Sequence, residues 1–232
     1  MLPREIPDVP GLELAYRYVP AETAAEVGGD WFDVITLRPG RCALIVGDVT
    51  GHDMRAASLM GQLRTATRTL ATLDLGPAEI LARLDQITAD LTNEETSATC
   101  VYAVHDTSTG EWDMARAGHP LPVVVRPGHA ATFLDLPPGM PLGLGTGQDE
   151  TVRVQPPPGS TLVFYTDGLI ERRTADLGTG MARLAGLLTR LSTVLTRLSS
   201  VKVQPATSIE GVASAYRTGH WSPASYCPGG SR

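Results

Sequence analysis

Two helical patterns lie side by side in this chain, with groups of strand patterns before and after them. Apolar residues recur with strand spacing over residues 12–18, 30–37 and 42–49, and then with helical spacing over residues 55–73 and 77–91. Strand patterns return at residues 97–105, 111–117, 121–126, 151–155 and 161–166, and a third helix is expected over residues 179–199. This order argues against a repeating βαβ fold and favours an α+β sandwich of antiparallel sheets flanked by helices.

Net charge, apolar runs and cysteine spacing exclude several classes of protein. The chain has 232 residues and a net charge of −6, which argues against nucleic acid or an anionic membrane as a main partner. It contains no run of about 18 apolar residues, and its start lacks the apolar core of a signal peptide. The three cysteines have neither metal-ligand nor redox spacing. The sequence therefore predicts a cytoplasmic, reduced protein with no membrane span and no nucleic-acid partner.

Three aspartates stand next to glycine at the ends of strand patterns. Asp48 and Asp167 each follow an apolar run, and Asp30 opens another strand pattern. A carboxylate at the end of a buried strand is costly unless a partner compensates it, and converging carboxylates suit a hard divalent cation such as Mg²⁺ or Mn²⁺. Asp48 is the best candidate to bridge two cations, and the Val49 carbonyl is a candidate oxygen ligand. Because Asp-Gly pairs are common in turns, three unrelated turn aspartates remain an open alternative.

Histidines lie close to two of these segments. His52, at the start of the first helical pattern, can be a general base, a metal ligand or a capping residue, and His119 is expected mainly to serve in a turn. His105, His129 and His220 are expected at the surface. No Ser, His and Asp arrangement and no Cys and His pair presents a nucleophile motif in the sequence.

Five motifs follow one another in a set order along the chain. They are AEVGGDWFD at residues 25–33, GDVTGH at 47–52, AASLM at 56–60, AGHP at 117–120 and YTDGLIE at 165–171. Together they closely resemble the SpoIIE/RsbU branch of the PPM metal-dependent protein phosphatases, the protein phosphatase 2C superfamily. The resemblance covers roughly residues 2–191, and the ordered set of motifs is specific to that branch.

The resemblance implies a PPM-type β-sandwich with a centre of two Mn²⁺ or Mg²⁺ ions that removes phosphate from phosphoserine or phosphothreonine. It carries the metal-ligand and catalytic roles to Asp30, Asp48 and Asp167, with the Val49 carbonyl as a further ligand, and gives Glu171 a supporting role. The implied substrate is a phosphorylated STAS-type anti-sigma-factor antagonist in partner-switching regulation. A homodimer of the chain stays open.

The C-terminal part departs from the family pattern. Family members resemble one another again in an Asp-Asp pair that opens a final strand, whereas here no aspartate follows Asp176 and the one later carboxylate side chain is Glu210. We therefore expect a phosphatase domain over residues 1–192 that lacks the final strand, followed by a divergent, disordered tail over residues 193–232. The alternative function is a degenerate, weakly active or inactive phosphatase-like binding module, because one metal ligand is missing.

Overall fold

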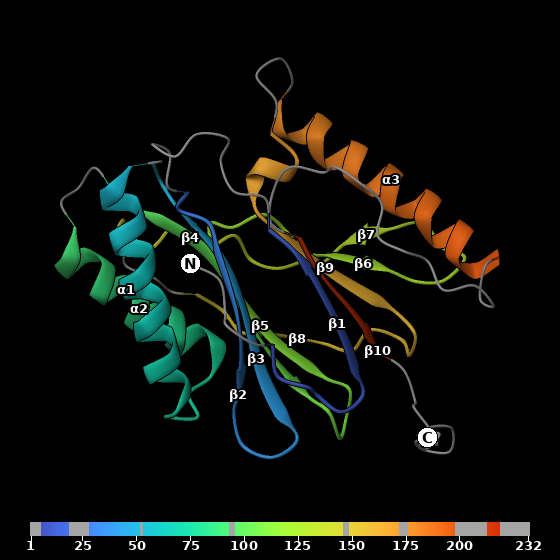
Figure 1. Cartoon of the computed structure of the whole chain (residues 1–232), viewed down its shortest axis with the longest axis horizontal. Coiled ribbons are helices and arrows are strands. Elements are labelled where there is room, and N and C mark those ends of the chain that lie inside the picture. Colours follow the sequence, from blue (N-terminus) through green and yellow to red (C-terminus); the bar gives the residue numbers. More distant parts are fainter. Residues whose placement is uncertain are drawn as a thin grey trace, which may run out of the picture.

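The computed structural model describes residues 6–18, 28–51, 53–92, 96–145, 149–171, 176–197 and 213–218. Within these residues, two five-stranded sheets lie face to face and α-helices cover their outer faces (Figure 1). All pairings between the named strands are antiparallel. The predicted α+β sandwich of antiparallel sheets flanked by helices is therefore confirmed.

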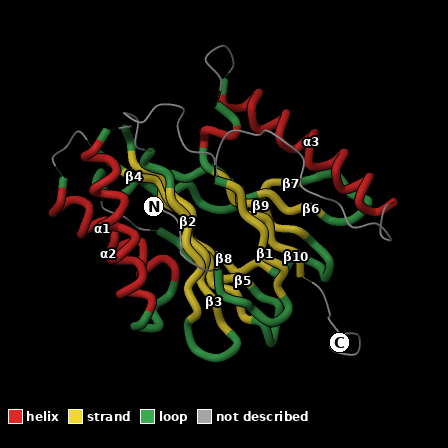
Figure 2. The backbone as a smooth tube through the Cα atoms, in the orientation of Figure 1, coloured by secondary structure: helices red, strands yellow, loops and turns green. Residues whose placement is uncertain are grey.

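The first sheet takes strands from both ends of the chain. Its order is β1 (Leu12–Arg17), β10 (Ala213–Thr218), β9 (Thr161–Tyr165), β6 (Val123–Val125) and β7 (Thr132–Phe133). Helix α3 (Leu177–Arg197) covers the outer face of this sheet (Figure 2), where Leu184 belongs to one buried cluster with Val123 and Tyr165. Helix α3 thus covers the face of the first sheet that points away from the second sheet.

The second sheet carries the helix pair. Its order is β2 (Trp31–Thr36), β3 (Arg41–Val49), β4 (Ala98–Asp106), β5 (Trp112–Ala117) and β8 (Val152–Val154). Helices α1 (Met54–Ala71) and α2 (Pro77–Leu91) lie across its outer face (Figure 1). The described residues therefore form four layers: a helix pair, two sheets and a single helix.

The helices begin close to where the sequence predicts. The Asp53 carboxylate caps α1 by accepting hydrogen bonds from the N–H groups of Arg55 and Ala56, at 3.0 and 2.9 Å. Pro77 opens α2, where a missing N–H costs nothing. Among the described residues, no helix combines the length and the apolar character needed to cross a membrane.

Strand β3 is buried on both faces, which explains its unbroken apolar run. Cys42, Leu44 and Val46 belong to the cluster between the two sheets, whereas Ala43 and Ile45 belong to the cluster under α1 and α2. Successive residues of a strand point to opposite faces, so this one strand contributes to two cores. The strand that carries Asp48 is therefore held firmly on both sides.

A buried ion cluster fixes α1 to β2. Asp33 is 1% exposed and accepts hydrogen bonds from Arg68 through Nε and Nη2, both at 2.6 Å, and from Arg64 Nε at 3.0 Å. A buried carboxylate is costly unless it is paired, and two arginines on successive turns of α1 supply the pairing. Helix α1 is thus tied to the strand that begins directly after Asp30.

The prediction that the final strand is missing is wrong. Strand β10 pairs along six residues with β1 and along five with β9. The segment has a weak strand pattern of its own, but hydrogen-bonded neighbours on both sides override that weakness. Residues 193–197 continue α3. Both segments lie in the span predicted to be a disordered tail, whose other residues lie outside the described part, so the domain division stays a prediction.

Candidate functional site

Asp30 and Asp48 face each other where β2 begins and β3 ends. Asp30 directly precedes β2, and Asp48 is the penultimate residue of β3. The Val49 N–H donates to the Gly29 carbonyl at 3.3 Å, which joins the two chain segments. The two carboxyl groups lie within hydrogen-bonding reach of each other. Two of the predicted ligands therefore meet in one place.

Asp167 approaches the same place from the other sheet. It opens a short 3₁₀ helix, η1 (Asp167–Leu169), that follows β9. The Thr166 hydroxyl donates to Asp30 Oδ2 at 3.1 Å, and the charge of Asp167 acts on both Asp30 and Asp48. Within the described residues, no group of three or more Asp, Glu, His or Cys side chains is close enough to hold a metal ion. The three aspartates thus share a region, with Asp30 and Asp48 as the contacting pair.

Gly29 leaves room for oxygen atoms that suit a cation. A β-carbon at this position would overlap the Val49 carbonyl oxygen and would lie 3.0 Å from Asp48 Oδ1. Both oxygens therefore border the space that a side chain would otherwise fill. Carboxylate and carbonyl oxygens are ligands that Mg²⁺ and Mn²⁺ prefer. The donor set of this region fits a hard divalent cation.

The paired carboxyls concentrate negative charge in a partly buried place. Burial is the main cause that raises the pKa of Asp30 to about 6 and the pKa of Asp48 to about 8, and neighbouring carboxylates add to both shifts. The hydrogen bond from Thr166 opposes the pKa shift at Asp30. Bound protons or a bound cation reduce the repulsion between the carboxylates and the cost of burying their charge.

We expect the metal-free chain to lose stability as the pH rises from about 4 to about 8, because both carboxyls bind protons more tightly when folded than when unfolded. The unfolded chain releases its protons first, so each rise in pH favours unfolding. The stabilisation is fully present below the unfolded pKa and is lost as the pH passes through the folded values. Thermal melts in chelator should show a falling midpoint, which added Mg²⁺ or Mn²⁺ restores.

The variant Asp48→Asn provides the control for this pH dependence. It removes the carboxyl with the larger upward pKa shift, so the midpoint should fall less steeply with pH than in the parent chain. An equally steep fall in the variant would show that other groups cause the pH dependence.

His119 has hydrogen-bond partners for both of its ring nitrogens. The ring is buried, with Nδ1 2.9 Å from Thr99 Oγ1 and Nε2 3.0 Å from the Tyr165 carbonyl oxygen. Burial lowers the pKa of the His119 imidazole to about 3, so the ring is neutral. Gly118 has a φ of +64° and forms an isolated bridge with Cys100, and the residues around His119 are not assigned as a turn. The histidine side chain instead joins the two sheets.

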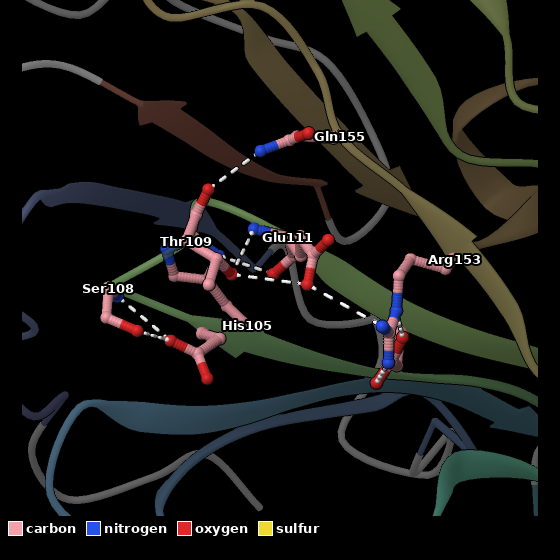
Figure 3. A network of polar contacts seen from close by, with 8 residues as sticks. His105, Ser108, Thr109, Glu111, Arg153 and Gln155 are labelled. Atoms are coloured by element: carbon pink, nitrogen blue, oxygen red, sulfur yellow. Dashed lines mark hydrogen bonds and ion pairs between the residues drawn. The ribbon is translucent and has the colours of Figure 1, made fainter.

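The prediction that His105 lies at the surface is wrong. Its ring is buried against Trp112, with 4.4 Å between the ring centroids, and its Nδ1 lies 3.2 Å from the Glu111 carbonyl oxygen (Figure 3). His105 belongs to β4, an inner strand of the second sheet, so its side chain is covered. Of the other histidines, His129 is exposed as predicted, and His52 and His220 lie outside the described residues.

A pocket of about 530 Å³ opens beside Asp167. Its lining combines the carboxylates of Asp167 and Glu171 with the Arg116 side chain and the apolar side chains of Leu177 and Met181. A second hollow, of about 560 Å³, lies on α1 and α2 and has no carboxylate, histidine or cysteine in its lining. Of these two hollows, the pocket at Asp167 is the one lined by carboxylates and a histidine.

Arg116 is a pocket residue that the sequence analysis did not single out. Its Nη1 donates to the His119 carbonyl at 2.7 Å and its Nη2 donates to the Leu136 carbonyl at 3.0 Å. A charged residue in a mostly apolar strand, just before Gly-His-Pro, was the available signal. Glu171, for which a supporting role is predicted, lines the same pocket, and its N–H donates to the Asp167 carbonyl at 2.7 Å.

A family model and a curated relative both match this chain, and they point to the same protein family. The family model described as Stage II sporulation protein E (SpoIIE) matches residues 38–214. The phosphoserine phosphatase RsbU of Bacillus subtilis (strain 168) is 24% identical over 176 residues, which are 75% of this chain and 51% of that protein. The chain thus spans about half the length of this curated relative.

Solved structures show the same fold. The RsbU and RsbW domains of Rv1364c from Mycobacterium tuberculosis match with a TM-score of 0.78 and 32% identity, over 94% of this chain and 64% of that chain. The PP2C phosphatase domain of SpoIIE from Bacillus subtilis, solved with a fragment of its regulatory domain, matches with a TM-score of 0.69 and 15% identity, over 91% of this chain and 64% of that chain. Since the family model covers more than half of the residues, the chain belongs to the Stage II sporulation protein E (SpoIIE) family and has its PP2C-type fold.

Proposed function

We propose that this chain is a metal-dependent serine/threonine protein phosphatase. The observation that carries the proposal is the approach of Asp30, Asp48 and Asp167 from two sheets to one region beside a pocket. Membership of the SpoIIE family and similarity to a phosphoserine phosphatase support it. The oxygen donors support a divalent cation, and both Mg²⁺ and Mn²⁺ suit them.

Each residue has a defined part in this proposal. Asp30, Asp48 and Asp167 would hold the cations together with the Val49 carbonyl, with Asp48 in the bridging role that the sequence predicts. Divalent cations held there would lower the pKa of water and neutralise charge on phosphoryl oxygens. The hydrogen bond from Thr166 fixes the orientation of the Asp30 carboxylate.

The pocket supports a phosphorylated polypeptide as the substrate. Arg116 offers a guanidinium group, which binds phosphate well, while Leu177 and Met181 offer apolar surface to side chains beside the phosphorylated residue. We propose a phosphorylated STAS-type anti-sigma-factor antagonist, acted on in a partner switch as the similarity to RsbU suggests. We also propose a cytoplasmic location, which suits such a substrate and the free, buried thiols of Cys42 and Cys100. A homodimer stays a prediction.

Phosphate release tests the proposal directly. A phosphorylated STAS protein and an aryl phosphate are incubated with the chain while Mn²⁺ or Mg²⁺ is titrated, with a chelator as the blank. We expect saturable release that requires the metal, and a preference for the protein substrate. A folded chain that releases no phosphate from either substrate at any metal concentration would refute the proposal.

The alternative, a binding module without efficient turnover, has one remaining observation in its favour. It rests on the missing final aspartate, which would leave the metal site one ligand short. Strand β10 is present, whereas no aspartate follows Asp176 in the sequence. Tight binding of the phosphorylated STAS protein without metal-dependent release would favour this alternative.

A further inference from the structure

We propose that His119 is a positioning residue that sets the separation between the aspartates of the two sheets. This inference rests on the proposed phosphatase function, because it concerns how the chain holds its metal ligands in place. The imidazole ring is buried and links β4 of the second sheet to the end of β9 in the first sheet through its two hydrogen bonds.

The hydrogen-bond partners determine which ring nitrogen carries the proton. The Tyr165 carbonyl oxygen can only accept a hydrogen bond, so Nε2, at 3.0 Å, must be the protonated nitrogen. Nδ1 is then an acceptor, and it receives the hydrogen bond of the Thr99 hydroxyl at 2.9 Å. Both nitrogens are engaged in this way, so neither is free to exchange a proton with a substrate, and the residue acts through its neighbours.

Each hydrogen bond ends beside a different part of the metal site. Thr99 lies directly opposite Asp48 in the register of β3 and β4. Tyr165 ends β9 and is followed by Thr166, which donates to Asp30, and then by Asp167. The ring of His119 therefore lies between the strand partner of one predicted ligand and the backbone that carries another.

A rigid ring suits this position better than a flexible side chain. The two nitrogens of an imidazole are held at a constant separation, and burial keeps water from replacing a lost hydrogen bond. Without the ring, the Thr99 hydroxyl and the Tyr165 carbonyl would lose their partner, and the ends of β3 and β9 would be free to move apart. Residues that orient metal ligands from outside typically change metal affinity by about 10–100-fold when replaced.

The test measures binding of Mn²⁺ alone by calorimetry, together with thermal midpoints in chelator and phosphate release. The variants are His119→Gln and the isosteric Thr99→Val, which removes one hydrogen bond and keeps the shape of the side chain. We expect both to weaken Mn²⁺ binding by about 10–100-fold, and turnover to recover largely at saturating metal. The two effects should not add in the double variant, because both variants break the same hydrogen bond. Thr99→Ser keeps the hydroxyl and should retain most of the affinity.

The variant His105→Gln is the matched control. His105 is also a buried histidine with a backbone carbonyl partner, but it lies near the opposite end of β4 from Thr99. The variant His105→Gln should lower the thermal midpoint of the chain and leave its affinity for Mn²⁺ unchanged. Should His119→Gln and Thr99→Val behave like this control, His119 is merely structural and the proposal is overturned.

Two further outcomes separate this inference from the proposed function. Metal-dependent turnover by the parent chain combined with unchanged Mn²⁺ affinity in both variants would overturn the role of His119 alone. Failure of the parent chain to bind Mn²⁺ would overturn both proposals. Magnetic resonance of the histidine ring nitrogens in the metal-free chain should show Nε2 of His119 protonated, and the opposite tautomer would also overturn the proposal.

Discussion

Replacing Asp48 by asparagine will abolish metal-dependent phosphate release and leave the chain folded. Asp48 is the penultimate residue of β3, a strand buried on both faces, and the charges of Asp30 and Asp167 act on its carboxyl group. An amide keeps the size of the side chain but removes its charge and one of its two ligand oxygens. Cations at such a site contribute several kcal/mol to the reaction, and about 1.4 kcal/mol is a factor of ten, so we expect a loss of roughly a thousandfold.

The same substitution should stabilise the metal-free chain. Burial, aided by neighbouring charges, raises the pKa of Asp48 to about 8, which means that its ionised form is unfavourable in the folded state. Asparagine removes that cost, and relief of about 1 kcal/mol would raise the thermal midpoint by about 2–4 °C. Added Mn²⁺ should stabilise the parent chain and have little effect on the variant. A loss of turnover together with a gain in stability would indicate that the Asp48 carboxylate serves function rather than folding.

Asp113→Asn is the matched control for these measurements. Asp113 is a carboxylate of the same sheet, and it pairs at 2.7 Å with Arg153 of the edge strand β8, which is labelled in Figure 3. Its removal should change neither turnover nor the response to Mn²⁺. Full turnover in Asp48→Asn, or an equal loss in Asp113→Asn, would remove the assignment of Asp48 as a ligand.

A chain that ends at residue 197 will not form the sandwich, whereas a chain that ends at residue 218 will. Strand β10 lies between β1 and β9 and is hydrogen-bonded to both. Without it, both neighbours present unpaired backbone groups along their whole facing edges. A domain has a net stability of only about 5–15 kcal/mol, which is too little to absorb the loss of an inner strand.

Size-exclusion chromatography and thermal melts of the two shortened chains check this prediction. The chain ending at residue 197 should aggregate or lack a cooperative transition, and it should release no phosphate. The chain ending at residue 218 lacks the last residues but keeps β10, so its midpoint should match that of the full chain. A cooperative transition at the full-chain midpoint in the shorter variant would show that β10 does not hold the first sheet together.

Local pattern predicted the elements that carry their own signals. Helix α2 begins at Pro77 as predicted, and the apolar run before Asp48 became β3 because that strand is buried on both faces. The two-residue strand β7 had no such signal, and the signal for β10 was weak. They exist because neighbouring strands pair with them, and this pairing brings together residues that are far apart in the sequence.

In the candidate site, too, some features could be predicted from the sequence and others depend on tertiary packing. The approach of Asp30, Asp48 and Asp167 could be expected from strand ends and from the resemblance to a phosphatase family. The contacts between the two sheets could not be expected, because they depend on how the sheets pack. In one of them the Thr166 hydroxyl donates to Asp30. In the other, the His119 ring joins Thr99 to Tyr165.

The buried pairing of Asp33 was equally hidden in the sequence. Arg64 and Arg68 are spaced one helical turn apart, which is ordinary for a solvated helix face. The structure shows that this face of α1 instead meets a buried carboxylate of β2.

The position of β10 also affects how the protein is made. Translation produces this strand after every other described element, yet it lies inside the first sheet, between β1 and β9. A nascent chain on the ribosome therefore has an open slot between β1 and β9 until the last strand emerges. Extended peptides add readily to such open edges, so the slot is a target for chaperones and for mispairing with other nascent chains. Catalysis by this chain would begin only after synthesis has passed residue 218.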